Sequence, residues 1–154
     1  MFQSIELKQG IHLHTRKTDQ FKTVNFSLKF KQNLSEKSAS ERSVLANVLL
    51  HSNNKYPSNS AFRSALDELY GTSMYMDSSK RGSEHIITFM AESVNDQYLS
   101  SEGVLNQVIE LLQTVLFNPN VDNHVFKENI VKREKDSVVQ RIESLYDDKT
   151  RYAQ

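Results

Sequence analysis

The stretch SVLANVLLHSNNKYPSN, residues 43–59, decides how this 154-residue chain divides into elements. Its first half spaces apolar residues as an amphipathic helix does, and its second half is a polar turn that contains a proline. Just before it, Ser38 and Glu41 match a capping box, in which each side chain satisfies a backbone N–H at the helix start. The sequence therefore predicts a helix that begins near residue 39 and ends before the turn.

Toward the N-terminus, residues 2–32 alternate between apolar and polar side chains. This period of two is typical of strands with one buried face. The apolar positions are Phe2, Ile5, Leu7, Ile11, Leu13, Val24, Phe26, Leu28 and Phe30. Gly10 and the polar segment 15–20 interrupt the alternation. We therefore expect three successive antiparallel strands.

Toward the C-terminus, helical and strand patterns alternate in blocks. Ser58 or Ser60 can cap a second helix, which Gly71 closes. The later elements expected are strands at 72–79 and 83–92 joined by the turn KRGS, a polar loop at 93–103, and helices at about 101–117 and from about 123 to beyond 147. Hairpin strands with helices grouped between them indicate an α+β domain, with an antiparallel-rich sheet covered by helices on one face.

Charge and composition exclude several classes of function. Nineteen basic and nineteen acidic residues cancel, so we expect no nucleic-acid partner. The chain has no cysteine, which excludes disulfides and thiolate metal sites and fits a cytoplasmic location. No apolar run is long enough for a signal peptide or a membrane span, so we expect no membrane partner.

Few side chains are arranged for chemistry. The set His51, Glu84 and His85 offers metal-ligand types, but Glu84 and His85 are strand neighbours that point to opposite faces. The remaining candidates have bland interpretations: His12 and His14 as solvent-facing strand residues, His124 as a helix-start residue near solvent, and Asp67, Glu68, Asp147 and Asp148 as solvated helix faces. Nothing in the sequence sets the fixed carboxylate separation that glycoside hydrolysis needs.

The order of these elements resembles the N-terminal part of the insulinase-type (pitrilysin-like, peptidase family M16) zinc metallopeptidases. The segments LDELYGTSM, FNPNV and VKREKDSVVQRIESLYDDKTRYA resemble inactive members of that family from low-GC Gram-positive bacteria. The resemblance covers the whole chain. In active members it implies a helix with His-x-x-Glu-His and a distal glutamate, which together hold zinc and activate its bound water.

The resemblance also implies where these residues should lie here. Matching the turn NNKYP to the turn after the family's motif helix places the motif at Ser43, Ala46 and Asn47. Matching EKDSVVQRI, with Glu134 at a family glutamate, places the distal ligand at Arg141. A hydroxyl, a methyl, an amide and a guanidinium cannot rebuild the site. The expectation is therefore no catalytic residue, no metal and no cofactor.

The function implied is that of a pseudo-peptidase, which pairs with an active zinc peptidase paralogue and helps form a chamber for a peptide or protein substrate. Family resemblance also implies association with 5-aminopentanol modification of elongation factor P. Residues 1–154 would be most of one N-terminal domain, without its closing elements and second domain. The alternatives are an active zinc-dependent peptidase with the atypical ligands His51, His85 and Glu84, and an unrelated binding module of the same architecture.

Overall fold

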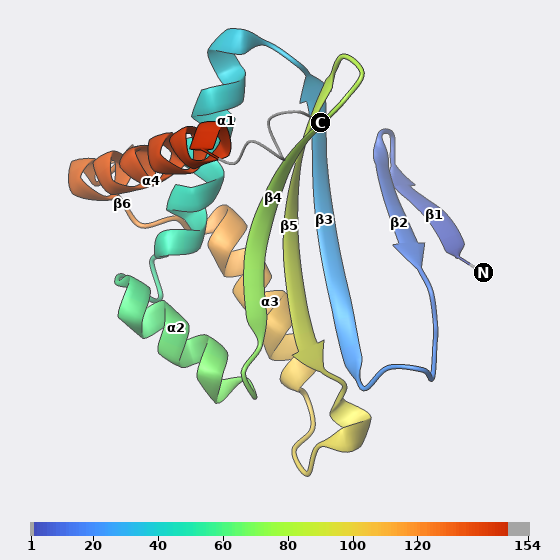
Figure 1. The fold of residues 1–154 in the computed structure, drawn as a ribbon. Coiled ribbons are helices and arrows are strands. Elements are labelled where there is room, and N and C mark those ends of the chain that lie inside the picture. Colours follow the sequence, from blue (N-terminus) through green and yellow to red (C-terminus); the bar gives the residue numbers. More distant parts are fainter. Residues whose placement is uncertain (1, 148–154) are drawn as a thin grey trace.

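The computed structural model describes residues 2–147 and confirms the predicted α+β class (Figure 1). Its elements are β1 (Gln3–Lys8), β2 (Ile11–Thr15), β3 (Thr23–Asn33), α1 (Glu36–His51), α2 (Asn59–Glu68), β4 (Ser73–Arg81), β5 (Glu84–Val94), a 3-10 turn (Asp96–Tyr98), α3 (Val104–Phe117), β6 (Val121–Asp122), β7 (Val125–Phe126) and α4 (Glu128–Asp147). No helix in this range is long and apolar enough to cross a membrane.

An antiparallel three-stranded sheet in the order β3-β5-β4 carries the core on one face. Pairing places Phe26 and Met74 on either side of Ala91, so alternate residues of all three strands point the same way. Figure 1 shows α1, α2 and α3 together on one side of this sheet, as the sequence predicts. The core between the two layers centres on Phe62, Val108 and Val115, each at most 1% exposed.

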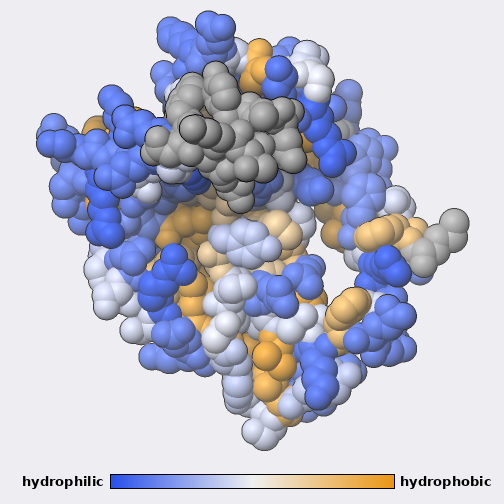
Figure 2. Space-filling view, viewed as in Figure 1, coloured by the Kyte–Doolittle hydropathy of each residue, from blue (hydrophilic) through white to orange (hydrophobic). Residues whose placement is uncertain are grey.

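The prediction of three successive paired strands is wrong at β3. β1 and β2 pair only with each other, as a separate two-stranded sheet, while β3 pairs with β5 over its full length. The β3–β5 pairing joins two long strands whose apolar phases coincide, which buries more surface than pairing with the five-residue β2 would. In Figure 2 the β1–β2 hairpin stands off from the body of the molecule with hydrophobic residues along it.

The capping-box prediction is also wrong. α1 begins three residues earlier than expected, after Ser35, whose extended backbone forms the N-cap without a side-chain hydrogen bond. The backbone N–H groups of Ser38 and Ala39 donate to the carbonyl of Ser35, so residue 38 is already helical. By contrast, Ser58 does cap α2, with its hydroxyl accepting a hydrogen bond from the N–H of Ala61 at 3.2 Å.

The start of α4 likewise differs from the prediction. Asn123 and His124 have left-handed backbones, with φ of 49° and 64°, and form the turn of the small β6–β7 hairpin. Asparagine and histidine are among the residues that tolerate this conformation. The helix therefore begins at Glu128, and the exposed His124 lies in a turn rather than at a helix start.

A turn whose first two residues, Ser52 and Asn53, are buried connects α1 to α2. Asn53 is fully buried, accepts a hydrogen bond from the N–H of Tyr56 through its side-chain oxygen, and forms a bridge to Pro119 after α3. Asn120 donates to the hydroxyl of Ser52 at 3.1 Å and to the carbonyl of Pro57 at 3.0 Å. The polar turn of the opening stretch is thus bonded to the end of α3.

Candidate functional site

The C-terminal half of α1 presents a partly polar face, on which Asn47 and His51 are polar and Leu50 packs against the edge of the core. Asn47, Leu50 and His51 are spaced at i, i+3 and i+4, which places them on one side of a helix. The neighbouring positions Ala46 and Val48 are buried, at 2% and 5% exposure. Burial of those two residues sets the rotation of the helix, so the polar face turns toward α4.

α4 brings a carboxylate to this face. The Nδ1 atom of His51 lies 2.9 Å from Oε1 of Glu134, and the two side chains are only 10% and 15% exposed. Because the pair is largely shielded from water, its hydrogen bond is stronger than that of an exposed pair. The contact joins residues 83 positions apart and links the end of α1 to the first half of α4.

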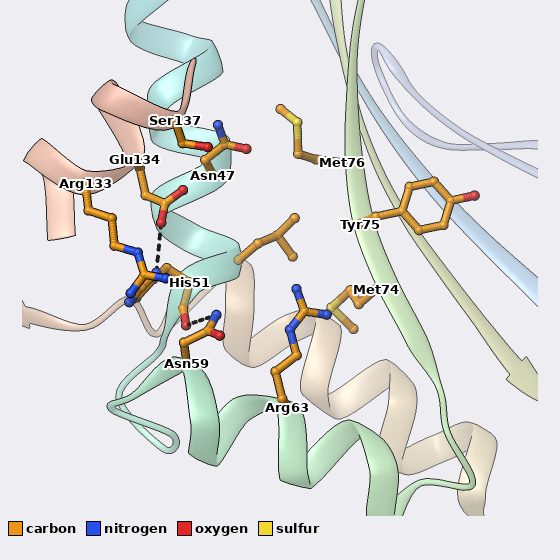
Figure 3. Close-up of a pocket in the computed structure, with 11 residues that line it drawn as sticks. Asn47, His51, Asn59, Arg63, Met74, Tyr75, Met76, Arg133, Glu134 and Ser137 are labelled. Atoms are coloured by element: carbon orange, nitrogen blue, oxygen red, sulfur yellow. Dashed lines mark hydrogen bonds and ion pairs between the residues drawn. The ribbon is translucent and has the colours of Figure 1, made fainter. Parts of the chain in front are cut away.

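These residues line a cavity of about 410 Å³ between α1, α2, α4 and β4 (Figure 3). Its walls are formed by Asn47, Leu50, His51, Asn59, Arg63, Met74, Tyr75, Met76, Arg133, Glu134 and Ser137. Asn59 donates to the backbone carbonyl of His51 at 3.4 Å, which ties α2 to the end of α1. The size is within the range of clefts that hold small ligands or single side chains of a bound peptide.

The lining is positively charged. Arg63 enters from α2 and Arg133 from α4, and both side chains are exposed. The only carboxylate of the lining, Glu134, is bonded to His51. Within residues 2–147 neither arginine forms an ion pair. The lining charges sum to a positive value whichever protonation state His51 takes.

Comparison with known proteins shows what this chain is similar to. No family model matches the chain. It is 38% identical over 145 residues to a Bacillus subtilis (strain 168) protein named "Probable inactive metalloprotease YmfF", an alignment that spans 94% of this chain and 34% of that protein. The chain is thus similar to part of a protein that is named as a probable inactive metalloprotease.

A solved structure has the same fold as this chain. The structure superimposes on the crystal structure of a conserved protein from Enterococcus faecalis V583 with a TM-score of 0.91 and 30% sequence identity. The match covers 99% of this chain and 36% of the other. The chain therefore spans about a third of the length of each of these relatives.

The four positions that the resemblance implied for the lost zinc site have different environments. Ser43 donates to the carbonyl of Ala39 at 3.0 Å, and Ala46 is 2% exposed in the core. Arg141 is exposed on α4, whereas Asn47 lines the cavity. Glu134, which the resemblance matches to a family glutamate seven residues before Arg141, makes the contact with His51 of α1.

The alternative zinc ligands do not come together. His51 is bonded to Glu134. His85 lies on β5 and is 5% exposed, with Nε2 2.9 Å from the hydroxyl of Ser78 and Nδ1 3.4 Å from Arg42. Arg42 can only donate, so the Nδ1 atom of His85 accepts and Nε2–H donates to Ser78. In the part of the chain that the structure describes, no three His, Cys, Asp or Glu side chains are placed to hold a metal.

Two histidines and two acidic residues lie where the sequence predicted them, on solvent-facing positions. His12 and His14 are exposed on β2, and Nδ1 of His14 is 2.8 Å from the hydroxyl of Ser4. Asp67 and Glu68 are exposed at the end of α2. The prediction for Asp148 lies outside the described residues, and so does that for the side chain of Asp147.

Sequence reasoning missed Arg63 and Arg133 and assigned no role to the pairing of His51 with Glu134. Both arginines lie in ordinary amphipathic helices, where a charged residue usually marks a solvated face. The available signal was the spacing Asn47-x-x-Leu50-His51, which repeats the i, i+3, i+4 pattern one turn after Ser43. Only the contact of His51 with Glu134 of α4 distinguishes a motif that begins at Asn47 from one that begins at Ser43.

Proposed function

We propose that this chain is part of a catalytically inactive peptidase homologue of the insulinase type, which pairs with an active zinc peptidase subunit and helps form a chamber for a peptide. The similarity to a protein named as a probable inactive metalloprotease supports the first part. The pairing, the chamber and the link to elongation factor P follow from the family resemblance alone. The proposed cytoplasmic location follows from the absence of cysteine.

The proposal rests on which residues α1 and α4 present to the cavity. His51 and Glu134 are zinc-ligand types in contact, and Asn47 and Leu50 precede His51 at the spacing of His-x-x-Glu-His. We infer that the family motif corresponds to Asn47, Leu50, His51 and Glu134, rather than to the positions that begin at Ser43. An amide then replaces the first histidine and an alkyl group replaces the glutamate.

That replacement accounts for inactivity. A zinc peptidase needs three protein ligands to hold the ion and a base to take the proton of the metal-bound water. Leu50 has no group that can accept a proton. Two ligand-type residues remain, which is fewer than the three of known catalytic zinc sites.

A peptide could still be held without these groups. β4 is an edge strand of the three-stranded sheet, and in the described part of the chain no strand pairs with its outer edge. Met74, Tyr75 and Met76 of β4 form one wall of the cavity. Edge strands bind extended peptides through backbone hydrogen bonds, a mode that needs neither a metal nor a base.

The two relatives are about three times as long as this chain. We propose that in such a protein residues 1–154 form most of one N-terminal domain, and that further segments close it and add a second domain. The β1–β2 hairpin pairs with no other strand in the described part of the chain, and its Ile5 and Leu13 are 54% and 43% exposed. These exposures support the proposal because apolar strand faces of that kind are normally covered.

The proposal predicts peptide binding without cleavage. We expect no zinc-dependent hydrolysis of quenched fluorescent peptides by the purified chain, and binding of labelled extended peptides in fluorescence anisotropy. Association with an active insulinase-type subunit would be measured by sedimentation of the mixture. Hydrolysis that requires zinc and is lost in His51→Ala would contradict the proposal and favour the active-peptidase alternative.

A further inference from the structure

We infer that the cavity between α1, α2, α4 and β4 binds a carboxylate of the peptide, held between Arg63 and Arg133. This inference rests on the proposed function, because it concerns the peptide that the chain would hold along β4. It assigns a ligand preference to two arginines that the lost zinc chemistry does not use. Figure 3 shows them entering the cavity from two different helices, with His51 and Asn59 in the same wall.

The charged groups around the cavity leave an excess of positive charge. α1 contributes His51, α2 contributes Arg63, and α4 contributes Arg133 and Glu134. Glu134 already accepts the 2.9 Å hydrogen bond of His51, so it does not neutralise both guanidinium groups. Tyr75 is the titratable residue of β4 at this site, and its ring points away from the cavity in Figure 3.

The chemistry of the lining matches a carboxylate. A guanidinium presents a planar fork of N–H donors that fits the two oxygens of a carboxylate. Asn47, Asn59 and Ser137 add neutral groups that can donate further hydrogen bonds. Neither arginine has an ion-pair partner within residues 2–147, so a bound carboxylate would add charged hydrogen bonds without displacing an existing pair.

A peptide carboxylate fits better than a phosphate or a polyanion. The chain has no net charge, so no long-range field gathers polyanions at this face. Glu134 would repel a doubly charged phosphate more strongly than a singly charged carboxylate. The adjoining edge of β4 would align an extended chain, so that one of its side chains or its C-terminus enters the cavity.

The test uses fluorescence anisotropy of the whole chain with four labelled extended peptides. Two peptides have an amidated C-terminus and differ only by glutamate or glutamine at one central position. Two lack acidic side chains and differ only in a free or an amidated C-terminus. In at least one of the two pairs, we expect the peptide with the additional carboxylate to bind about tenfold more tightly than the other peptide of that pair. A factor of this size is usual for a hydrogen bond to a charged group.

Substitution of each arginine then tests whether it causes the preference for the peptide with a carboxylate. Arg63→Gln and Arg133→Gln should each weaken binding of the preferred acidic peptide about tenfold and leave the neutral peptide unchanged. The matched control is Arg81→Gln, which removes the same charge from an exposed residue at the β4–β5 turn, outside the cavity. Its affinities should equal those of the unsubstituted chain, and circular dichroism checks that each variant is folded.

The outcomes separate the inference from the proposed function. Equal binding of acidic and neutral peptides, or a loss in Arg81→Gln as large as in Arg63→Gln, overturns the carboxylate site and leaves peptide binding intact. Failure of every peptide to bind overturns both the site and the peptide-holding role. The pair that shows the preference identifies whether a side chain or the C-terminus supplies the carboxylate.

Discussion

The Asn47→His, Leu50→Glu double variant is expected to bind about one equivalent of zinc, whereas the unsubstituted chain should retain less than about a tenth of an equivalent. The change places a second imidazole one helical turn before His51, on the face that already meets Glu134 at 2.9 Å. Two imidazoles and a carboxylate form a known set of zinc ligands. The new carboxylate at position 50 restores the base position beside them.

Elemental analysis of protein purified without chelator measures this prediction, and thermal unfolding with and without zinc supports it. Free zinc at about one hundred times its dissociation constant should stabilise the double variant by about 2.7 kcal/mol. The matched control adds Glu134→Gln to the two substitutions. Because it removes one ligand and leaves the fold of α1 unchanged, it should lose the bound metal.

A second control decides whether the family motif begins at Asn47 or at Ser43. The quadruple variant Ser43→His, Asn47→His, His51→Ala, Arg141→Glu installs the same three ligand types at the positions that sequence resemblance implies. It also removes the imidazole of His51, which would otherwise form the first site with the new histidine at position 47 and Glu134. We expect it to hold no stoichiometric zinc, because Arg141 is exposed and lies outside the cavity that Glu134 lines. Zinc in this variant, together with none in the Asn47→His, Leu50→Glu variant, would show that our structural assignment is wrong.

Phe62→Ala should lower the free energy of unfolding by about 3–5 kcal/mol. Phe62 is 1% exposed, lies at the centre of the core beneath the sheet, and packs against Tyr56 with ring centroids 6.4 Å apart. Truncation removes the ring contacts and leaves a cavity that the surrounding strands and helices cannot fill. Since small domains are stable by only about 5–15 kcal/mol, much of the chain should be unfolded at modest urea concentration.

Urea denaturation followed by circular dichroism measures this loss, with Phe117→Ala as the matched control. Phe117 ends α3 and is 73% exposed, so the same truncation should change the free energy of unfolding by no more than about 0.5 kcal/mol. Similar losses in the two variants would mean that the core does not centre on α2. A change in the slope of the transition would instead mean that the substitution alters the compactness of the unfolded or the native state, or that unfolding is no longer two-state.

The α+β class and most of the elements follow from local pattern. Period-two alternation identifies β1 to β5, and helical spacing identifies α1 to α4, because side-chain direction repeats every two residues in a strand and every 3.6 in a helix. Ends were less certain where several polar residues could act as caps. Ser35 rather than Ser38 begins α1, whereas Ser58 and Gly71 were correctly placed.

By itself the sequence determined the types and order of the elements, the lack of thiolate chemistry, and the missing His-x-x-Glu-His motif. Only the tertiary structure decided that β3 pairs with β5, that the β1–β2 hairpin stands apart, and that His51 meets Glu134. The physical reason is that local periodicity records which face of an element is buried, but not which distant element covers it. That choice depends on how much apolar surface each pairing removes from water across the whole fold.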